Sequence, residues 1–253
     1  MLYLQHKIYI IHYYLNKYFP RQCYNLVLTA EWLLRTMRLR KSKRLVLVYG
    51  EPRSGTSFIT NLIHKMGFYA GPYVWLLNAN QSNPDGYFEC VPFQNNLDKF
   101  IENSEFNFEN NLPEASLNLP KEVKLKIKSI VDNGNIELLK YNKFSLFADS
   151  ISEVFPEAFW IHVYRDPEAV YTSNNKFIGG RNRDSFFKAY NKRLGLWKHS
   201  NISKRAIEIN YSKLVQQEDV LRLVIKLQSI LSISLTDEQV NDCVSLFRPK
   251  YVN

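Results

Sequence analysis

Short apolar runs alternate with amphipathic helical patterns along residues 44–253. Four runs have the length and the apolar content of buried strands; they are "RLVLVYG" (44–50), "NIELLKYN" (135–142), "EAFWIHVYRD" (157–166) and "KRAIEINY" (204–211). Each is followed by a segment with helical spacing, and strands that alternate with helices form mostly parallel sheets with right-handed crossovers. The pattern predicts an α/β fold of three layers, in which helices flank a mostly parallel central sheet.

Several predicted helices have recognisable ends. The segment "TSFITNLIHKMG" (56–67) spaces its apolar residues as a helix does and stops at Gly67, a residue type that commonly ends helices. Pro167 suits a first helical position, and Asp166 before it suits an N-cap. Further helical patterns cover residues 119–135, 145–155, 183–200, 217–233 and 235–247. Residues 70–120 are rich in Asn, Pro and Gly and predict a long irregular stretch, which in a compact domain is more often functional than idle.

Residues 1–43 differ from the rest of the chain in charge and in aromatic content. Residues 1–44 contain nine Lys and Arg against one acid, Glu31, so most of the formal charge of +9 belongs to this segment. The stretch "NLVLTAEWLLRTMRLRKSKR" is spaced like an amphipathic helix that ends in a cationic cluster. We therefore expect a basic, aromatic, helical extension over 1–43 and a main domain over 44–253. The extension either packs on the core or lies on an anionic membrane surface.

Composition narrows the class of protein further. A chain of 253 residues with 45% apolar content can bury a full α/β core, and a pI of about 9.3 favours an anionic partner. The three cysteines are far apart and lack C-x-x-C spacing, which predicts no zinc site and favours a reducing compartment. No apolar run approaches the roughly 20 residues that span a bilayer, and the start of the chain is a poor signal peptide. We expect a cytoplasmic protein without a metal site and, since no recognised module accompanies the basic segment, without nucleic acid.

The stretch "GEPRSGTS" (50–57) follows the first predicted strand and has the glycine spacing of a nucleotide-binding P-loop. In that pattern a Lys follows the second glycine, but Thr56 occupies this position here, and the nearest cation is Arg53. Backbone N–H groups of residues 53–57 are expected to converge on an anion at the start of a helix, where the helix dipole also favours negative charge. The loop therefore predicts phosphate binding without the usual lysine.

A second polar cluster follows the third predicted strand. Arg165 ends the strand, and Ser173 lies about two turns into the following helix. Ligands of parallel α/β sheets bind at the carboxyl ends of the strands, so Arg165 and the 50–57 loop are expected at one crevice. A guanidinium and a hydroxyl placed in this way would together hold a second phosphate.

The two motifs together resemble the signature of sulfotransferases that use 3′-phosphoadenosine-5′-phosphosulfate (PAPS), and "PRSGTS" is most similar to bacterial members. The resemblance covers roughly residues 44–235 and identifies 44–253 as a sulfotransferase domain. It implies that the 5′-phosphosulfate binds at the first loop and the 3′-phosphate at the Arg and Ser of the second motif. The donor-binding residues implied are Pro52, Arg53, Ser54, Gly55, Thr56, Ser57, Arg165, Ser173 and Tyr211. Arg181, with Arg183 close by, follows the Ser173 helix and either helps to neutralise the 3′-phosphate or lies in a solvated loop. No metal is implied.

The resemblance also implies catalytic positions. Lys140 stands at the strand end where relatives have Lys-x-Pro, but Asn142 replaces the Pro, so the aim of Lys140 stays open between the site and solvent. Arg53 and Lys140 would stabilise the leaving phosphate. Relatives use His or Glu as the base; Glu89 is the first choice here and Asp85 the second. Two histidines, His64 and His162, are weaker candidates because their helix and strand positions suit a solvated or a core side chain.

Three other functions are consistent with parts of the sequence. A nucleotide kinase would use the 50–57 loop with ATP and Mg²⁺, but the absent lysine argues against it. A membrane-associated nucleotide-binding protein that has lost turnover would explain the basic N-terminus, and nucleic-acid binding would explain its charge alone. For an enzyme, the aromatic residues near the crevice favour a glycan or glycolipid hydroxyl as acceptor; they are Tyr73, Trp75, Tyr87 and Phe88.

Overall fold

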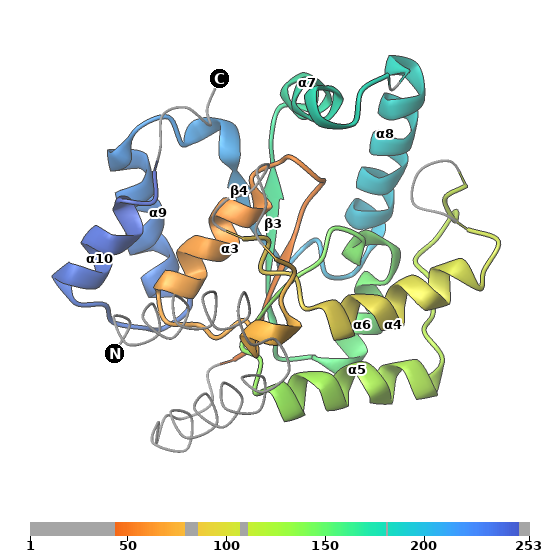
Figure 1. Cartoon of the computed structure of the whole chain (residues 1–253), viewed down its shortest axis with the longest axis horizontal. Coiled ribbons are helices and arrows are strands. Elements are labelled where there is room, and N and C mark those ends of the chain that lie inside the picture. Colours follow the sequence, from red (N-terminus) through yellow and green to blue (C-terminus); the bar gives the residue numbers. More distant parts are fainter. Residues whose placement is uncertain (1–43, 79–85, 107–110, 181, 248–253) are drawn as a thin grey trace, which may run out of the picture. The chain divides into compact units, whose positions relative to one another are not determined.

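A single parallel sheet forms the centre of the unit that begins at Arg44 (Figure 1). The computed structural model describes residues 44–78, 86–106, 111–180 and 182–247. The strands are β1 (Val46–Tyr49), β2 (Leu138–Lys140), β3 (Phe159–Tyr164) and β4 (Ile207–Asn210). Their order is β2-β1-β3-β4 and each neighbouring pair is parallel. All four lie within the runs predicted from the sequence, so the predicted α/β class with a parallel sheet is confirmed.

The strand order creates a switch point between β1 and β3. After β1 the chain crosses to β2 on one side, and after β3 it crosses to β4 on the other side. The loops that leave the carboxyl ends of β1 and β3 therefore turn away from each other and leave a crevice between them. Ligands of open α/β sheets bind at such a point.

One face of the sheet is covered by three helices, α3 (Thr56–Lys65), α9 (Gln217–Ile230) and α10 (Asp237–Val244) (Figure 1). Val46 and Val48 of β1 point into this layer and pack with residues of the neighbouring strands, including Ile161 and Val163. These side chains are fully buried. Burial of one such side chain stabilises the fold by about 1.5–3 kcal/mol.

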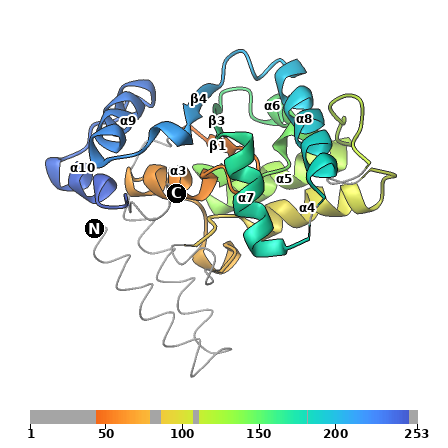
Figure 2. The same cartoon turned by 90° about the horizontal axis from the view of Figure 1, so that it is seen from above.

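The opposite face is covered by α4 (Val91–Glu102), α5 (Lys121–Gly134), α6 (Ala148–Val154) and α8 (Arg183–His199) (Figure 2). Leu47 and Tyr49 point into this second layer, where they join a core rich in aromatic residues such as Trp160 and Trp197. Successive side chains of a strand face opposite sides. The uninterrupted apolar run of β1 therefore supplies both layers, and the predicted three-layer arrangement is the one observed.

The helix α7 (Pro167–Ile178) begins directly behind the end of β3 and has the cap predicted from the sequence. The Asp166 side chain accepts a hydrogen bond from the Ala169 N–H over 2.9 Å, and Pro167 occupies the first helical turn. Val170 of α7 packs against Phe186 and Tyr190 of α8. These contacts fix the start of α7 beside the crevice.

The prediction of an irregular stretch over residues 70–120 was wrong in its centre. The 12-residue helix α4 lies there, together with a short 3-10 turn, η1 (Tyr73–Trp75). The buried side chains of α4 are Phe93, Leu97 and Ile101, which recur every fourth residue as in an amphipathic helix. The density of Asn and Pro around Pro92 obscured this spacing, although Pro is well tolerated in a first helical turn.

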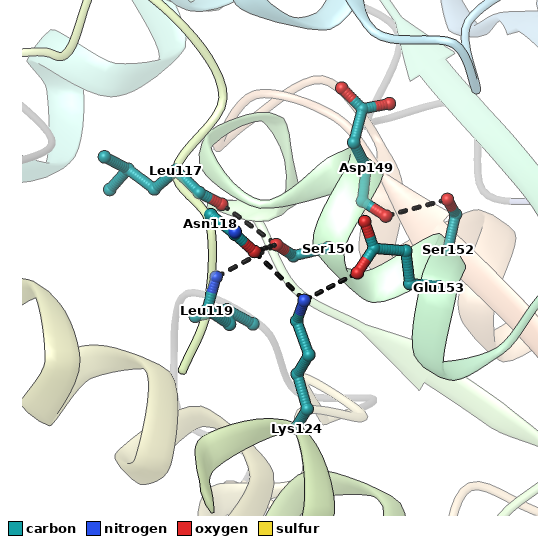
Figure 3. A network of polar contacts seen from close by, with 8 residues as sticks. All are labelled: Leu117, Asn118, Leu119, Lys124, Asp149, Ser150, Ser152 and Glu153. Carbon is teal, nitrogen blue, oxygen red and sulfur yellow. Dashed lines mark hydrogen bonds and ion pairs between the residues drawn. The ribbon is translucent and has the colours of Figure 1, made fainter. Parts of the chain in front are cut away.

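A polar network ties the chain before α5 to α6 (Figure 3). The Ser150 hydroxyl accepts from the Leu119 N–H over 2.9 Å, and Lys124 donates to Asn118 over 3.0 Å and pairs with Glu153 over 2.6 Å. Irregular backbone needs such partners when it is covered by other elements. The network therefore fixes this segment on the second layer.

The expected helical extension over 1–43 lies outside the described residues. Within the described part of the chain, none of the helices has the length and apolar character that a bilayer crossing requires.

Candidate active site

The loop between β1 and α3 has the backbone of an anion-binding turn. Arg53 has a φ of 73° and Gly55 a φ of 94°, so two of its residues are left-handed. Non-glycine residues adopt this conformation rarely, and such strain concentrates at functional sites. Gly55 is the N-cap of α3 and offers no capping side chain, and the first turn of α3 contains no acid. The first N–H groups of α3 are therefore available to an anionic ligand.

The two glycines of the loop allow close approaches that any side chain would block. A Cβ on Gly50 would lie 2.2 Å from the Val163 carbonyl oxygen of β3. A Cβ on Gly55 would lie 2.3 Å from the Tyr211 ring, which comes from η3 (Tyr211–Lys213) after β4. The loop is thus held against the ends of two other strands.

The loop and the second motif meet at the crevice. The Arg53 Nε donates a hydrogen bond to the Ser173 Oγ over 3.1 Å, although the two residues lie 120 positions apart. The Arg165 guanidinium lies over the Tyr211 ring, 5.7 Å from its centre. Burial and the positive charge of Arg165 lower the pKa of Arg53. Two guanidinium groups, one hydroxyl and one aromatic ring therefore converge at the switch point, as a phosphorylated nucleotide would require.

Lys140, at the end of β2, supplies a further cation to the same loop. Its Nζ donates to the Ser57 Oγ over 2.9 Å and pairs with the Glu89 carboxylate over 2.8 Å. The side chain of Lys140 is only 2% exposed, so the solvated alternative does not apply. Burial lowers the pKa of Lys140, while Glu89 opposes this shift. The replacement of the expected proline by Asn142 leaves the lysine aimed into the site.

Glu89 is held on both of its carboxylate oxygens. One pairs with Lys140, and the other accepts a hydrogen bond from the Gln94 side chain over 2.9 Å. The preceding residue, Phe88, has a φ of 54°, a conformation that bulky residues avoid. The backbone carbonyl of Tyr87 accepts a hydrogen bond from Lys140 over 3.2 Å. The segment before α4 is thereby bound to the end of β2, with a carboxylate beside the cation.

Three further residues implied for the donor belong to this loop. Pro52 is half-buried at the loop's turn, whereas Ser54 and Thr56 are buried. Within the described part of the chain, the Ser54 Oγ has no hydrogen-bond partner. Buried hydroxyls usually have one. An unsatisfied hydroxyl in an anion-binding turn fits a site that is completed by its ligand.

Several other residues considered in the sequence have partners of their own or lie outside the described residues. His162 is buried between Tyr49 and Trp197, and burial lowers its pKa, which suits a core side chain. His64, in the last turn of α3, contacts the backbone carbonyl oxygen of Phe68 over 2.9 Å. Arg183, at the start of α8, forms an exposed ion pair with Glu168 in the first turn of α7, three residues after Arg165. Asp85 and Arg181 lie outside the described residues.

The structure adds residues that the sequence analysis missed. Gln94 contacts Glu89 from the first turn of α4, a helix that was not predicted. A buried ion pair joins Glu51 of the loop to Arg193 of α8 over 2.7 Å. The sequence contains no signal that singles out this pair, because Glu51 lies in a polar loop and Arg193 is one of several charged residues of α8. In the residues that the structure describes, no group of three or more His, Cys, Asp and Glu is arranged to hold a metal ion.

No protein-family model matches the sequence, and no curated sequence matches it significantly. Solved structures of similar fold include the sulfotransferase STF1 from Mycobacterium tuberculosis H37Rv, with 12% identity, a TM-score of 0.44 and coverage of 87% of this chain and 76% of its own. The sulfotransferase STF9 from Mycobacterium avium has 14% identity, a TM-score of 0.48 and coverages of 93% and 71%. The sulfotransferase domain of the Synechococcus PCC 7002 olefin synthase has 14% identity, a TM-score of 0.45 and coverages of 85% and 81%. All three TM-scores are below 0.5.

Proposed function

We propose that residues 44–253 form a sulfotransferase domain, which moves a sulfonyl group from PAPS to an acceptor hydroxyl and releases adenosine 3′,5′-bisphosphate. The observation that carries the proposal is the hydrogen bond between Arg53 and Ser173. It joins the loop expected to hold the 5′-phosphosulfate to the motif expected to hold the 3′-phosphate. A nucleotide with phosphate groups at the 3′ and 5′ positions of its ribose would use both.

Each part of the donor has matching groups in this crevice. The N–H groups of residues 53–57 would bind the 5′-phosphosulfate, with the Arg53 guanidinium beside it. Arg165 and Ser173 would hold the 3′-phosphate through charge-assisted hydrogen bonds. Tyr211 would lie near the adenine. Arg181 belongs to the proposal through its position in the sequence alone.

Lys140 takes the place of the lysine that the loop lacks. It reaches Ser57 from a neighbouring strand instead of following the second glycine. In P-loop kinases the corresponding hydroxyl binds Mg²⁺, but here it accepts a hydrogen bond from an ammonium group. This contact favours sulfonyl transfer over a kinase activity. A sulfonyl group carries less charge than a phosphoryl group, so fixed cations and N–H groups would suffice to stabilise its transfer.

The transfer exchanges one sulfur–oxygen bond for another. The acceptor oxygen forms a bond to sulfur as the bond between sulfur and the bridging phosphate oxygen breaks, and the bonding electrons remain on the phosphate. Arg53 and Lys140 would stabilise this leaving phosphate. Glu89 would accept the proton of the acceptor hydroxyl. Its ion pair with Lys140 holds the carboxylate beside the proposed leaving group.

The acceptor we propose is a glycan or glycolipid hydroxyl. Tyr87 lies over Lys140, with 5.6 Å between the ring centre and the Nζ, and offers an aromatic face next to Glu89. Contact of the 1–43 segment with an anionic membrane surface would bring the domain to lipid-linked acceptors. We place the protein in the cytoplasm because the spacing of its three cysteines favours a reducing compartment. Activity with water-soluble phenols and none with glycans would contradict this choice of acceptor.

The direct test is to incubate the full chain with PAPS and a panel of glycans, glycolipids and phenols, and to measure the bisphosphate released. We expect release that depends on a glycan or glycolipid. Glu89→Gln should slow it by about 10²- to 10⁴-fold, the usual contribution of a general base. Glu102→Gln, on an exposed position of α4, is the matched control and should behave like the wild type. Binding of the bisphosphate without release for any acceptor would favour an inactive nucleotide-binding protein instead.

A further inference from the structure

A buried ion pair lies beneath the proposed anion-binding loop. The Arg193 Nε lies 3.0 and 2.8 Å from the two carboxylate oxygens of Glu51, and its Nη2 lies 2.7 Å from one of them. Only 5% of the Arg193 side chain and 8% of the Glu51 side chain are exposed. This is a two-pronged contact between a planar guanidinium and a carboxylate, the strongest geometry for such a pair.

Glu51 is part of the loop itself. It is the second residue after β1, and its backbone carbonyl accepts the Ser54 N–H over 3.1 Å, which closes the turn that precedes the left-handed Gly55. Arg193 lies in the interior of α8, on the face that packs against the sheet. The pair therefore connects the loop to a helix that does not itself reach the proposed donor groups.

A carboxylate in this position works against anion binding. A negative charge in a poorly solvated loop repels a second negative charge much more strongly than it would in water. Burial raises the pKa of Glu51, and the charge of Arg193 opposes that shift. Without Arg193, the loop would contain a carboxylate with only a neutral partner, the hydrogen-bonded Tyr49 side chain, next to the site where a phosphosulfate is expected.

We propose that Arg193 is a positioning residue that acts through Glu51: it neutralises this carboxylate and holds the loop so that its N–H groups meet an anion. The inference rests on the proposed nucleotide site, because it assigns a role toward that ligand. Arg193 is too deeply buried to reach the ligand itself. Its contribution is to keep the sign of the charge at the loop positive.

Other groups that face Glu51 do not provide this neutralisation. Tyr49 of β1 and Tyr190 of α8 lie close to it, and burial raises the pKa of both phenols, so they stay uncharged. Behind them His162 of β3 stacks on Tyr49 with 5.2 Å between the ring centres, and burial lowers its pKa. Burial therefore favours the neutral form of this histidine. Arg193 is the cation that the structure places directly against this carboxylate.

The test measures the dissociation constant for adenosine 3′,5′-bisphosphate by calorimetry between pH 6 and pH 9. The variants are Arg193→Met, which removes the charge, and the double variant Glu51→Gln with Arg193→Met, which removes both charges. The ligand's own phosphates titrate near pH 6 in every sample, so the ratio of the two variants isolates Glu51. Circular dichroism at each pH confirms that the protein is folded.

We expect Arg193→Met to bind at least about tenfold more weakly than the double variant at pH 8.5 and to approach it at pH 6. The affinity of Arg193→Met should fall as the pH rises, because the Glu51 carboxylate is charged at high pH and repels the anionic ligand. At high pH the ligand binds well only when this carboxylate takes up a proton. The double variant should follow the pH profile of the wild type. A tenfold effect corresponds to one pKa unit of coupling between Glu51 and the ligand.

Equal pH profiles for Arg193→Met and the double variant would overturn the inference, since a purely structural pair would lower stability without a pH-dependent affinity. If Arg193→Met does not fold at neutral pH, Glu51→Gln in the wild-type background replaces it: tighter binding of the bisphosphate than by the wild type supports the charge role of the pair, and unchanged or weaker binding overturns it. A wild type that does not bind the bisphosphate would instead refute the proposed function. The two failures are therefore distinguishable.

Discussion

The Nε of Arg53 donates a hydrogen bond to the Oγ of Ser173 over 3.1 Å. Arg53 comes from the loop after β1 and Ser173 from the middle of α7, so the contact closes the switch point between β1 and β3. In our account the two side chains hold different phosphates of one nucleotide. Their contact then sets the distance between the two phosphate subsites.

Loss of the Ser173 hydroxyl should weaken binding of adenosine 3′,5′-bisphosphate by about tenfold, as expected for one hydrogen bond to a charged group. AMP, which has no 3′-phosphate, should bind Ser173→Ala and the wild type equally well. Calorimetric titration of both ligands measures this difference. Thr172→Ala is the matched control, because Thr172 is the exposed neighbour on the same helix. An equal loss for AMP would argue that Ser173 only supports the loop.

Removal of the Lys140 charge should slow turnover more than it weakens donor binding. We expect Lys140→Met to lower kcat by about 10²- to 10³-fold, the usual cost of one group that stabilises developing charge. Lys143→Met is the control, since Lys143 lies on the following turn and pairs with Asp98 over 2.6 Å instead. Steady-state rates of bisphosphate release provide the comparison. Equal effects of the two substitutions would remove Lys140 from the mechanism.

The pH dependence of turnover should also report on Lys140. Burial lowers its pKa below the usual value of about 10.5, so the ammonium group loses its proton, and the site loses a positive charge, at a lower pH than for an exposed lysine. Turnover should therefore fall on the alkaline side below pH 10.5. In Lys140→Arg the guanidinium stays charged, and the alkaline fall should move to higher pH even if the maximal rate is lower. If turnover of Lys140→Arg falls at the same alkaline pH as that of the wild type, the fall reports the titration of another group.

The close approach of the loop to β3 should be visible in stability. Gly50→Ala places a methyl group 2.2 Å from the Val163 carbonyl oxygen and should destabilise the fold by about 1–3 kcal/mol, as overpacking does. Gly195→Ala is the control: it lies in α8 with open space around its Cβ position, and should stabilise the fold by roughly 0.5–1 kcal/mol. Urea denaturation measures both. A neutral Gly50→Ala would contradict the packing described here.

The sequence predicted the elements whose pattern is local. The four strands, the cap formed by Asp166 and Pro167, and the end of α3 before Gly67 follow from residue type and spacing within a few positions. The helix α4 was missed because the turn-forming residues around Pro92 outweighed a spacing of only three buried side chains. Turn-forming residues and helical spacing gave opposite predictions for this segment. The helix forms because its apolar side chains pack into the second layer.

The candidate site was predictable where two motifs lie at the ends of adjacent strands. Ligands of parallel sheets bind at the carboxyl ends of the strands, and this alone predicted that the motifs of Arg53 and Ser173 share one crevice. The two side chains are hydrogen-bonded in the structure. The contacts of Lys140 with Ser57 and of Glu51 with Arg193 were not predictable in the same way. Each joins residues more than 80 positions apart, and the orientation of either side chain depends on the packing of a whole layer.

The central claim is a site for a nucleotide with phosphates at the 3′ and 5′ positions. The most direct measurement is the thermal stability of the full chain with adenosine 3′,5′-bisphosphate, with AMP, and with ATP plus Mg²⁺. At about 100 times its dissociation constant, a bound ligand stabilises the native state by about 2.7 kcal/mol.

We expect stabilisation by the bisphosphate, and its loss in Arg165→Ala but not in the exposed control Arg222→Ala on α9. Stabilisation by ATP plus Mg²⁺ in place of the bisphosphate would contradict the account and favour a kinase.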